Sequence, residues 1–309
     1  MTLMIDLPFP GIEPWVGYYR EVDLPVLRHT AQQIEVMRAD AENINARKLA
    51  SVILHDPMMT LRVFAFIESR RGKRQSTDIT TIERGLMMIG IHPFFEHFKD
   101  MPIIEVQLKA HPKAMLGVLK TFTRARNAAN WSRDWATIRR DLDVEEIGIA
   151  ALLHDFAEIL MWCFAPTLAL RVRDRQQADR TLRSIAVQAM EFGVPLYQLK
   201  LELAKAWGLP QLLITLMDPE HAESPRVKNV KLAVDLARHS ANGWADAALP
   251  DDYHDIQELL HVDHENLLRR VGAPPEVILA LRVAAEAKAA AETEAAAANP
   301  VSVDSALKP

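Results

Sequence analysis

Helix boundary signals recur along the 309-residue chain, whereas signals for β-strands are scarce. Asp56 can cap a helix, and Pro57 suits the first helical position, where no N–H is needed. Thr80 and Glu83 have the spacing of a capping box, and Gly90 can end the helix that they open. No hairpin dipeptide lies between alternating apolar runs, and the chain has only 11 glycines. The sequence therefore predicts an all-α protein.

The spacing of these signals predicts two packed helical lobes. The first lobe spans residues 22–110 and follows an N-terminal flank, 1–21. The second lobe spans 111–275, and an alanine-rich tail, helical or disordered, follows at 276–309. The helices that we expect in the second lobe are one at 114–139, one that follows Asp143 and contains residues 150–155, and others near 176–192, 196–206, 210–217, 225–242, 251–260 and 263–270.

The charge balance and the single cysteine limit the functions open to the chain. A net charge of −5 and a pI of about 6.1 argue against a protein whose main task is to bind a nucleic-acid backbone. Cys163 is the only cysteine, which excludes an intramolecular disulfide and a multi-thiolate zinc site. The most apolar stretch, 147–170, is interrupted by His154, Asp155 and Glu158, unlike a membrane span. We therefore expect a cytoplasmic protein with no nucleic-acid or membrane partner.

The His154-Asp155 doublet is the sharpest chemical signal in the sequence. On a buried helix, an imidazole and an adjacent carboxylate can supply two ligands to a metal, which offsets the cost of burying charge. A metal that activates water for attack on a phosphate needs further ligands from other helices. The alternative is structural, with His154 hydrogen-bonded inside the core.

Segments on both sides of the doublet resemble, in order, the motifs of the HDOD family, bacterial output domains related to the HD metal hydrolases. Residues 50–60, ASVILHDPMMT, are similar to a helix junction of that family, and residues 79–90, ITTIERGLMMIG, to a helix that ends in Leu-Gly. Residues 146–156, EIGIAALLHDF, resemble its His-Asp helix, and residues 207–210, WGLP, its Trp-x-Leu-Pro turn. The ordered set lies within residues 22–242 and implies membership of this family.

The resemblance implies a helical fold built around a metal site, of which this chain keeps little. No histidine occurs between Pro112 and Leu153, where the resemblance implies the first ligand. Leu196, Glu220 and Val234 stand where further ligands are implied. The resemblance therefore implies a degraded site that binds no metal and no cofactor.

From the missing ligands we expect a non-catalytic regulatory or signal-transduction module, a pseudo-enzyme in which His154 and Asp155 are vestigial. It would act through a protein partner in a signalling pathway or through a small ligand. The alternative is a metal-dependent phosphohydrolase acting on a nucleotide or cyclic dinucleotide, for which His221 and Asp235 would have to join the doublet. A third reading is a pocket that binds a nucleotide-type ligand without hydrolysis, with Arg124 or Arg126 in place of the metal. The candidate pocket residues are Arg124, Arg126, Glu158, His221 and Asp235.

Overall fold

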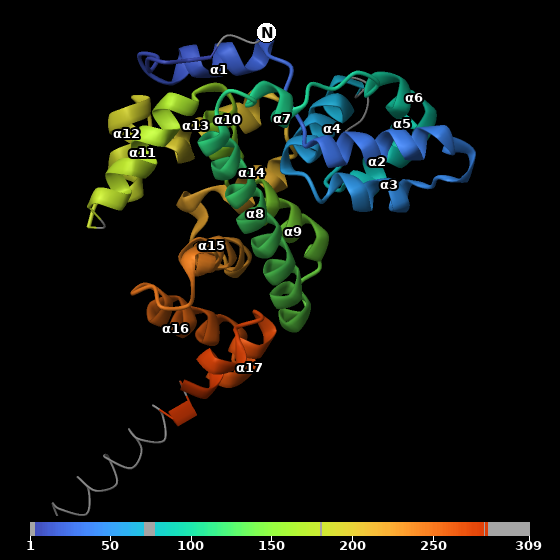
Figure 1. The fold of residues 1–309 in the computed structure, drawn as a ribbon. Coiled ribbons are helices and arrows are strands. Elements are labelled where there is room, and N and C mark those ends of the chain that lie inside the picture. The colour runs from blue at the N-terminus through green and yellow to red at the C-terminus, as the bar shows by residue number, and fades with distance from the viewer. Residues whose placement is uncertain (1–3, 71–77, 180, 281, 284–309) are drawn as a thin grey trace, which may run out of the picture.

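The computed structural model describes residues 4–70, 78–179, 181–280 and 282–283. Within these ranges the chain forms the α-helices α1–α17, a further helical stretch at 275–280 and three short 3-10 helices, and no β-strand (Figure 1). One isolated parallel bridge joins Val26 to Ile103. The all-α prediction is confirmed.

The N-terminal lobe is a group of short helices, on the right in Figure 1. Asp56 joins two of them: Oδ1 accepts the N–H groups of Met58 and Met59 at 2.8 and 3.0 Å, and Oδ2 accepts the N–H of Leu27 at 3.1 Å. Asp56 therefore caps the helix after it, as expected, and also holds the start of another helix. The helices are α2 (Arg28–Ala39), α3 (Ala46–Ile53), α4 (Pro57–Arg70), α5 (Ile82–Ile89), α6 (Ile91–His97) and α7 (Ile104–Gln107).

The second lobe is organised around its longest helix, α8 (Pro112–Arg139), which packs against α9, α10 and α15. Figure 1 shows α11–α13 on one side of this axis and α15–α17 below them. The remaining helices are α9 (Val144–Leu153), α10 (Phe156–Phe164), α11 (Pro166–Ala178), α12 (Ser184–Phe192), α13 (Leu196–Ala206), α14 (Gln211–Met217), α15 (Pro225–His239), α16 (Leu249–Leu260) and α17 (His264–Arg270).

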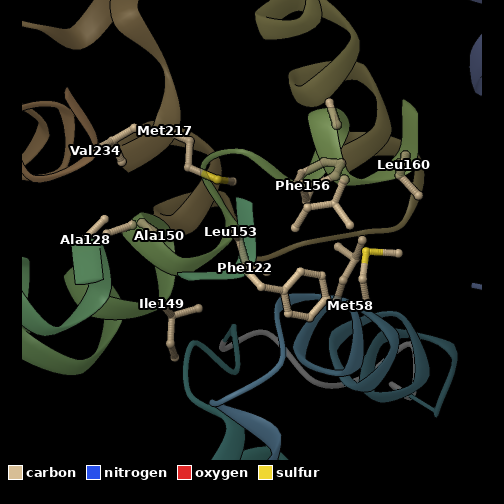
Figure 2. Packing of buried hydrophobic residues seen from close by; sticks show 14 of the residues in the cluster. Met58, Phe122, Ala128, Ile149, Ala150, Leu153, Phe156, Leu160, Met217 and Val234 are labelled. Carbon is tan, nitrogen blue, oxygen red and sulfur yellow. The ribbon is translucent and has the colours of Figure 1, made fainter. Parts of the chain in front are cut away.

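The apolar run Val144–Phe164 forms the centre of the core. It has the length and hydropathy of a membrane span, but 83% of it is buried inside the fold and its helix is interrupted at residues 154–155. Figure 2 shows Met58 of α4 in one cluster with Phe122 of α8 and Phe156 of α10. The two lobes therefore share a continuous hydrophobic core, which fixes α4 against α9.

The N-terminal segment is part of the fold, although the sequence predicts only a flank there. Residues 12–21 form α1 (Ile12–Glu21), which packs against α13 of the second lobe. Trp15 is fully buried, and its Nε1 donates to the carbonyl oxygen of Phe192 at 3.1 Å. Tyr19 stacks on Trp15 with ring centroids 5.8 Å apart. The burial of two large aromatic side chains anchors α1.

Two local predictions are wrong in detail. Thr81, not Thr80, caps α5, because the Thr80 hydroxyl instead donates to Glu146 at 2.6 Å. The single helix predicted at 176–192 is two helices, since Asp179 accepts the N–H and hydroxyl of Thr181 in a turn that ends α11. Of the predicted tail, 276–309, only residues 276–280 and 282–283 are described, so most of it lies outside the described residues.

Candidate functional site

The His154-Asp155 doublet forms the junction between α9 and α10. The α9 helix ends at Leu153 and α10 begins at Phe156, so the two residues lie outside both helices. His154 Nδ1 and Asp155 Oδ1 are 3.0 Å apart, within hydrogen-bonding distance. Both side chains are largely buried, at 22% and 13% exposed. The doublet is thus bonded to itself at the edge of the core.

Two arginines flank the carboxylate of Asp155. Arg124 of α8 lies 3.8 Å from Asp155 Oδ2 and donates to Glu158 Oε2 at 2.7 Å. Arg238 of α15 lies 3.8 Å from Asp155 Oδ1. Burial alone would raise the pKa of Asp155, but the hydrogen bond with His154 and the charges of Arg238 and Arg124 hold that pKa well below its usual range. Asp155 is therefore a carboxylate neutralised by protein side chains.

A third cation, Lys200 of α13, lies close to this group. Its side chain is 2% exposed, and its Nζ donates to the carbonyl oxygen of Met217 at 3.0 Å. Burial lowers the pKa of Lys200 to about 8, against the attraction of Asp155. Burial also lowers the pKa of His154, and the positive charge of Lys200 lowers it further. His154 is therefore neutral at pH 7, whereas Lys200 still carries most of its charge.

The doublet and the three cations line one large cavity of about 1760 Å³. Its walls come from α8, α10–α13 and α15, together with the segment after α14. Within it, Asp235 of α15 accepts from Lys231 at 2.7 Å and from Arg238 at 3.4 Å. The walls therefore combine paired acids with a set of lysines and arginines.

The structure gathers some of the predicted pocket residues and separates others. Arg124, Glu158 and Asp235 line the cavity together with the doublet. Arg126 and His221 are exposed and do not line it, because their side chains lie on the outer surfaces of α8 and of the turn after α14. Arg124, and not Arg126, is thus the arginine directed at the doublet.

Lys200 and Arg238 are the important members that sequence reasoning missed. Lys200 lies within the apolar stripe formed by the buried side chains of Leu196, Leu199 and Leu203, so this lysine is on the inner face of an amphipathic helix. A lysine in such a stripe could have been recognised from the sequence as a candidate buried charge. Arg238 lies three residues after Asp235 on the same helix, a spacing at which side chains meet.

The donors at this site do not fit a divalent metal. Among the residues that the structure describes, no group of three or more His, Cys, Asp or Glu side chains is placed to hold one. The two donors of the doublet face each other, and Arg124 and Arg238 lie beside the carboxylate. The places around Asp155 that a cation would take are near positive charges that the protein itself supplies.

Comparison with known proteins agrees with this architecture. The family model of the HDOD domain matches residues 24–223, well over half of the chain. The chain belongs to the HDOD family. Among curated proteins, none matches the chain in sequence.

Two solved structures have a fold similar to that of this chain at low sequence identity. The MmoQ response regulator from Methylococcus capsulatus is 18% identical, with a TM-score of 0.58 over 82% of this chain and 99% of that one. A virulence factor from Campylobacter jejuni is 19% identical, with a TM-score of 0.61 over 85% of this chain and 96% of that one. At such identities the likeness concerns the fold alone.

Proposed function

We propose that this HDOD protein is a non-catalytic regulatory module in which side-chain cations take the place of a metal. The observation that carries the proposal is the position of Arg124 and Arg238, each 3.8 Å from an oxygen of Asp155. A divalent ion on that carboxylate would lie beside both guanidinium groups and near Lys200. Repulsion between like charges in a largely buried site opposes metal binding.

The hydrogen bond within the doublet supports the same conclusion. A carboxylate can orient a histidine that binds metal through its other nitrogen, or it can be a ligand itself. With His154 Nδ1 and Asp155 Oδ1 at 3.0 Å, the geometry favours the first role. Only the Nε2 atom of His154 would then remain as a donor. A single imidazole falls short of the three or four ligands that hold a catalytic zinc.

The regulatory role is supported by what the site retains. A cavity of about 1760 Å³ remains at the doublet, and the continuous core holds the two lobes as one support for it. One of the structures with a similar fold is named a response regulator. We propose that the protein acts in the cytoplasm through a protein partner in a signalling pathway, with the cavity available to a small ligand.

Metal content is the decisive test of the non-catalytic proposal. The full chain, purified without chelators, is expected to carry well below one manganese, iron or zinc ion per molecule. His154→Ala and His254→Ala form a matched pair, because His254 is an exposed histidine with a side chain 73% accessible. A stoichiometric metal that survives His254→Ala and is lost in His154→Ala would contradict the proposal. So would manganese-stimulated phosphodiester hydrolysis that Asp155→Asn abolishes.

A further inference from the structure

The cavity at the doublet is lined by seven lysines and arginines and by six carboxylates, and not all of these charges are in ion pairs. Asp155 and Glu158 pair with Arg124, and Asp235 pairs with Lys231. Three more acids, Asp218, Glu220 and Asp246, also line the cavity, and Asp218 attracts Lys200 from beyond ion-pair distance. Some of the other cations that line the cavity are not in ion pairs. Among the described residues, three lysines that line the cavity have no carboxylate within ion-pair distance, and these are Lys113, Lys120 and Lys200.

The three lysines differ in depth. Lys113 and Lys120 are exposed on α8 and seven residues apart, which places their Cα atoms about 10 Å apart along the helix. Lys200 comes from another wall and is 2% exposed, with a carbonyl oxygen as its hydrogen-bond acceptor. Nearby, the Nε of Arg124 is buried and has no hydrogen-bond partner in the described part of the chain. The cavity lining thus includes one buried donor without an acceptor and two exposed ammonium groups outside any ion pair.

An apolar surface lies next to these charges. Leu116 of α8 and Ile185 of α12 line the same cavity and are 54% and 58% exposed. Leu182 and Tyr197 add to this surface at 39% and 38% exposed. Apolar side chains gathered at a concave surface with a few polar groups are typical of ligand sites.

We infer that this cavity binds an organic polyanion free of metal, with its negative groups at Lys200 and the lysines of α8 and its apolar part against Leu116 and Ile185. The inference rests on the proposed function, since it takes the doublet to hold no metal. The burial of Lys200 favours a small molecule over a peptide, because a slender anionic group reaches such an ammonium and a folded segment does not. The ammonium groups serve phosphate and carboxylate equally as point charges.

The experiment is isothermal titration of the full chain in EDTA at low salt with four probes. ATP carries a polyanion and an apolar ring, tripolyphosphate carries the polyanion alone, and citrate is a polycarboxylate. Poly-glutamate represents an acidic peptide. We expect ATP to bind saturably and more tightly than tripolyphosphate, because only ATP also covers the apolar surface. Citrate binding as tightly as ATP would assign the site to carboxylates within the same chemistry.

The variants test the location. Lys200→Met and the double variant Lys113→Ala/Lys120→Ala are each expected to weaken ATP binding about tenfold or more, in line with the loss of a charge-assisted hydrogen bond. The double variant changes only exposed side chains, so it tests the location independently of any change in the core around Lys200. Lys109→Ala, at an exposed lysine outside the cavity, is the control and should leave binding unchanged.

Three results would overturn the inference. These are no saturable binding of any small anion, binding that is indifferent to both lysine variants, and tight binding of poly-glutamate alone. The last would assign the cavity to a peptide. Failure of the inference differs from failure of the proposed function: binding that requires manganese and ends in hydrolysis contradicts the proposed function, whereas absence of binding without any metal or hydrolysis contradicts only the inference.

Discussion

Replacing Lys200 with methionine should stabilise the protein at neutral pH. Burial lowers the pKa of this lysine from 10.5 to about 8, so the folded state holds the charged form less favourably than the unfolded chain does. One pKa unit is worth about 1.4 kcal/mol, so the charged lysine costs the fold about 3 kcal/mol at pH 7. Loss of the hydrogen bond to Met217 removes about 1 kcal/mol in return.

The expected net gain for Lys200→Met is therefore about 2 kcal/mol in the free energy of unfolding, because methionine fills a similar volume without a charge. Urea denaturation followed by circular dichroism measures it at pH 7. Lys205→Met is the matched control on the same helix, where the lysine is 57% exposed and pairs with Glu202 at 2.9 Å. A surface pair of this kind contributes at most about 1 kcal/mol, so the control should be neutral or slightly destabilised.

The stability gained in Lys200→Met should depend on pH. Below pH 8 both states of the wild type bind the proton on Lys200 and the full penalty applies. Between about pH 8 and 10.5 the folded state releases the proton first, so the stability of the wild type rises relative to the variant. The difference between the two proteins should shrink toward the small loss from the missing hydrogen bond. Destabilisation at pH 7, or a difference that does not change with pH, would refute the reasoning.

Two further predictions concern other buried contacts. Asp56→Ala should lower the free energy of unfolding by about 2–4 kcal/mol, since it removes the cap of α4 and leaves the N–H of Leu27 without its acceptor. Urea denaturation measures the loss, with Asn45→Ala, a variant of an exposed helix cap, as the control. A smaller loss for Asp56→Ala than for Asn45→Ala would contradict the prediction. The hydrogen bond to Asp252 raises the pKa of His239, so their interaction stabilises the fold below pH 6.5 and weakens as pH rises through the raised pKa. Wild type should therefore lose stability relative to His239→Gln between pH 6 and 8, by less than about 1 kcal/mol, and parallel pH profiles would count against it.

Much of the fold was predictable because its signals are local. Asp56-Pro57 and Gly90 mark helix ends through backbone chemistry that depends on neighbouring residues alone. The helix predicted at 196–206 coincides with α13 for the same reason. Such signals need no knowledge of the tertiary structure, so a single sequence suffices to find them.

The wrong predictions depend on contacts between distant residues. Thr80 does not cap α5 because its hydroxyl bonds Glu146, which is 66 residues away in the chain. The segment before residue 22 was predicted as a flank because it is acidic and interrupted by prolines, yet Trp15 reaches the carbonyl oxygen of Phe192. Long-range partners of this kind leave no periodic pattern in the sequence.

At the site, too, local motifs could be predicted from the sequence and contacts between distant residues could not. The motif around His154 and Asp155 located the cavity, and of the two arginines considered for it, Arg124 lies beside the doublet. Arg126, two residues further along the helix, was an equal candidate, because only the orientation of α8 decides which side chain turns inward. Lys200 carried a signal in its apolar stripe, but Arg238 gained its role only through the packing of α15 against α8.

If side-chain cations replace a metal at this site, as we propose, the replacement has a chemical consequence. A metal ion lowers the pKa of bound water and so supplies hydroxide at neutral pH. A guanidinium group neutralises a carboxylate equally well but has no open coordination position, and because its pKa lies far above neutral it neither binds hydroxide nor donates a proton readily. Arg124 and Arg238 can therefore maintain the charge balance around Asp155 without hydrolytic chemistry, while Lys200 keeps its attraction for an anion. We infer that such a site can retain a ligand and lose the reaction, and a retained ligand that is never consumed is what a regulatory module requires.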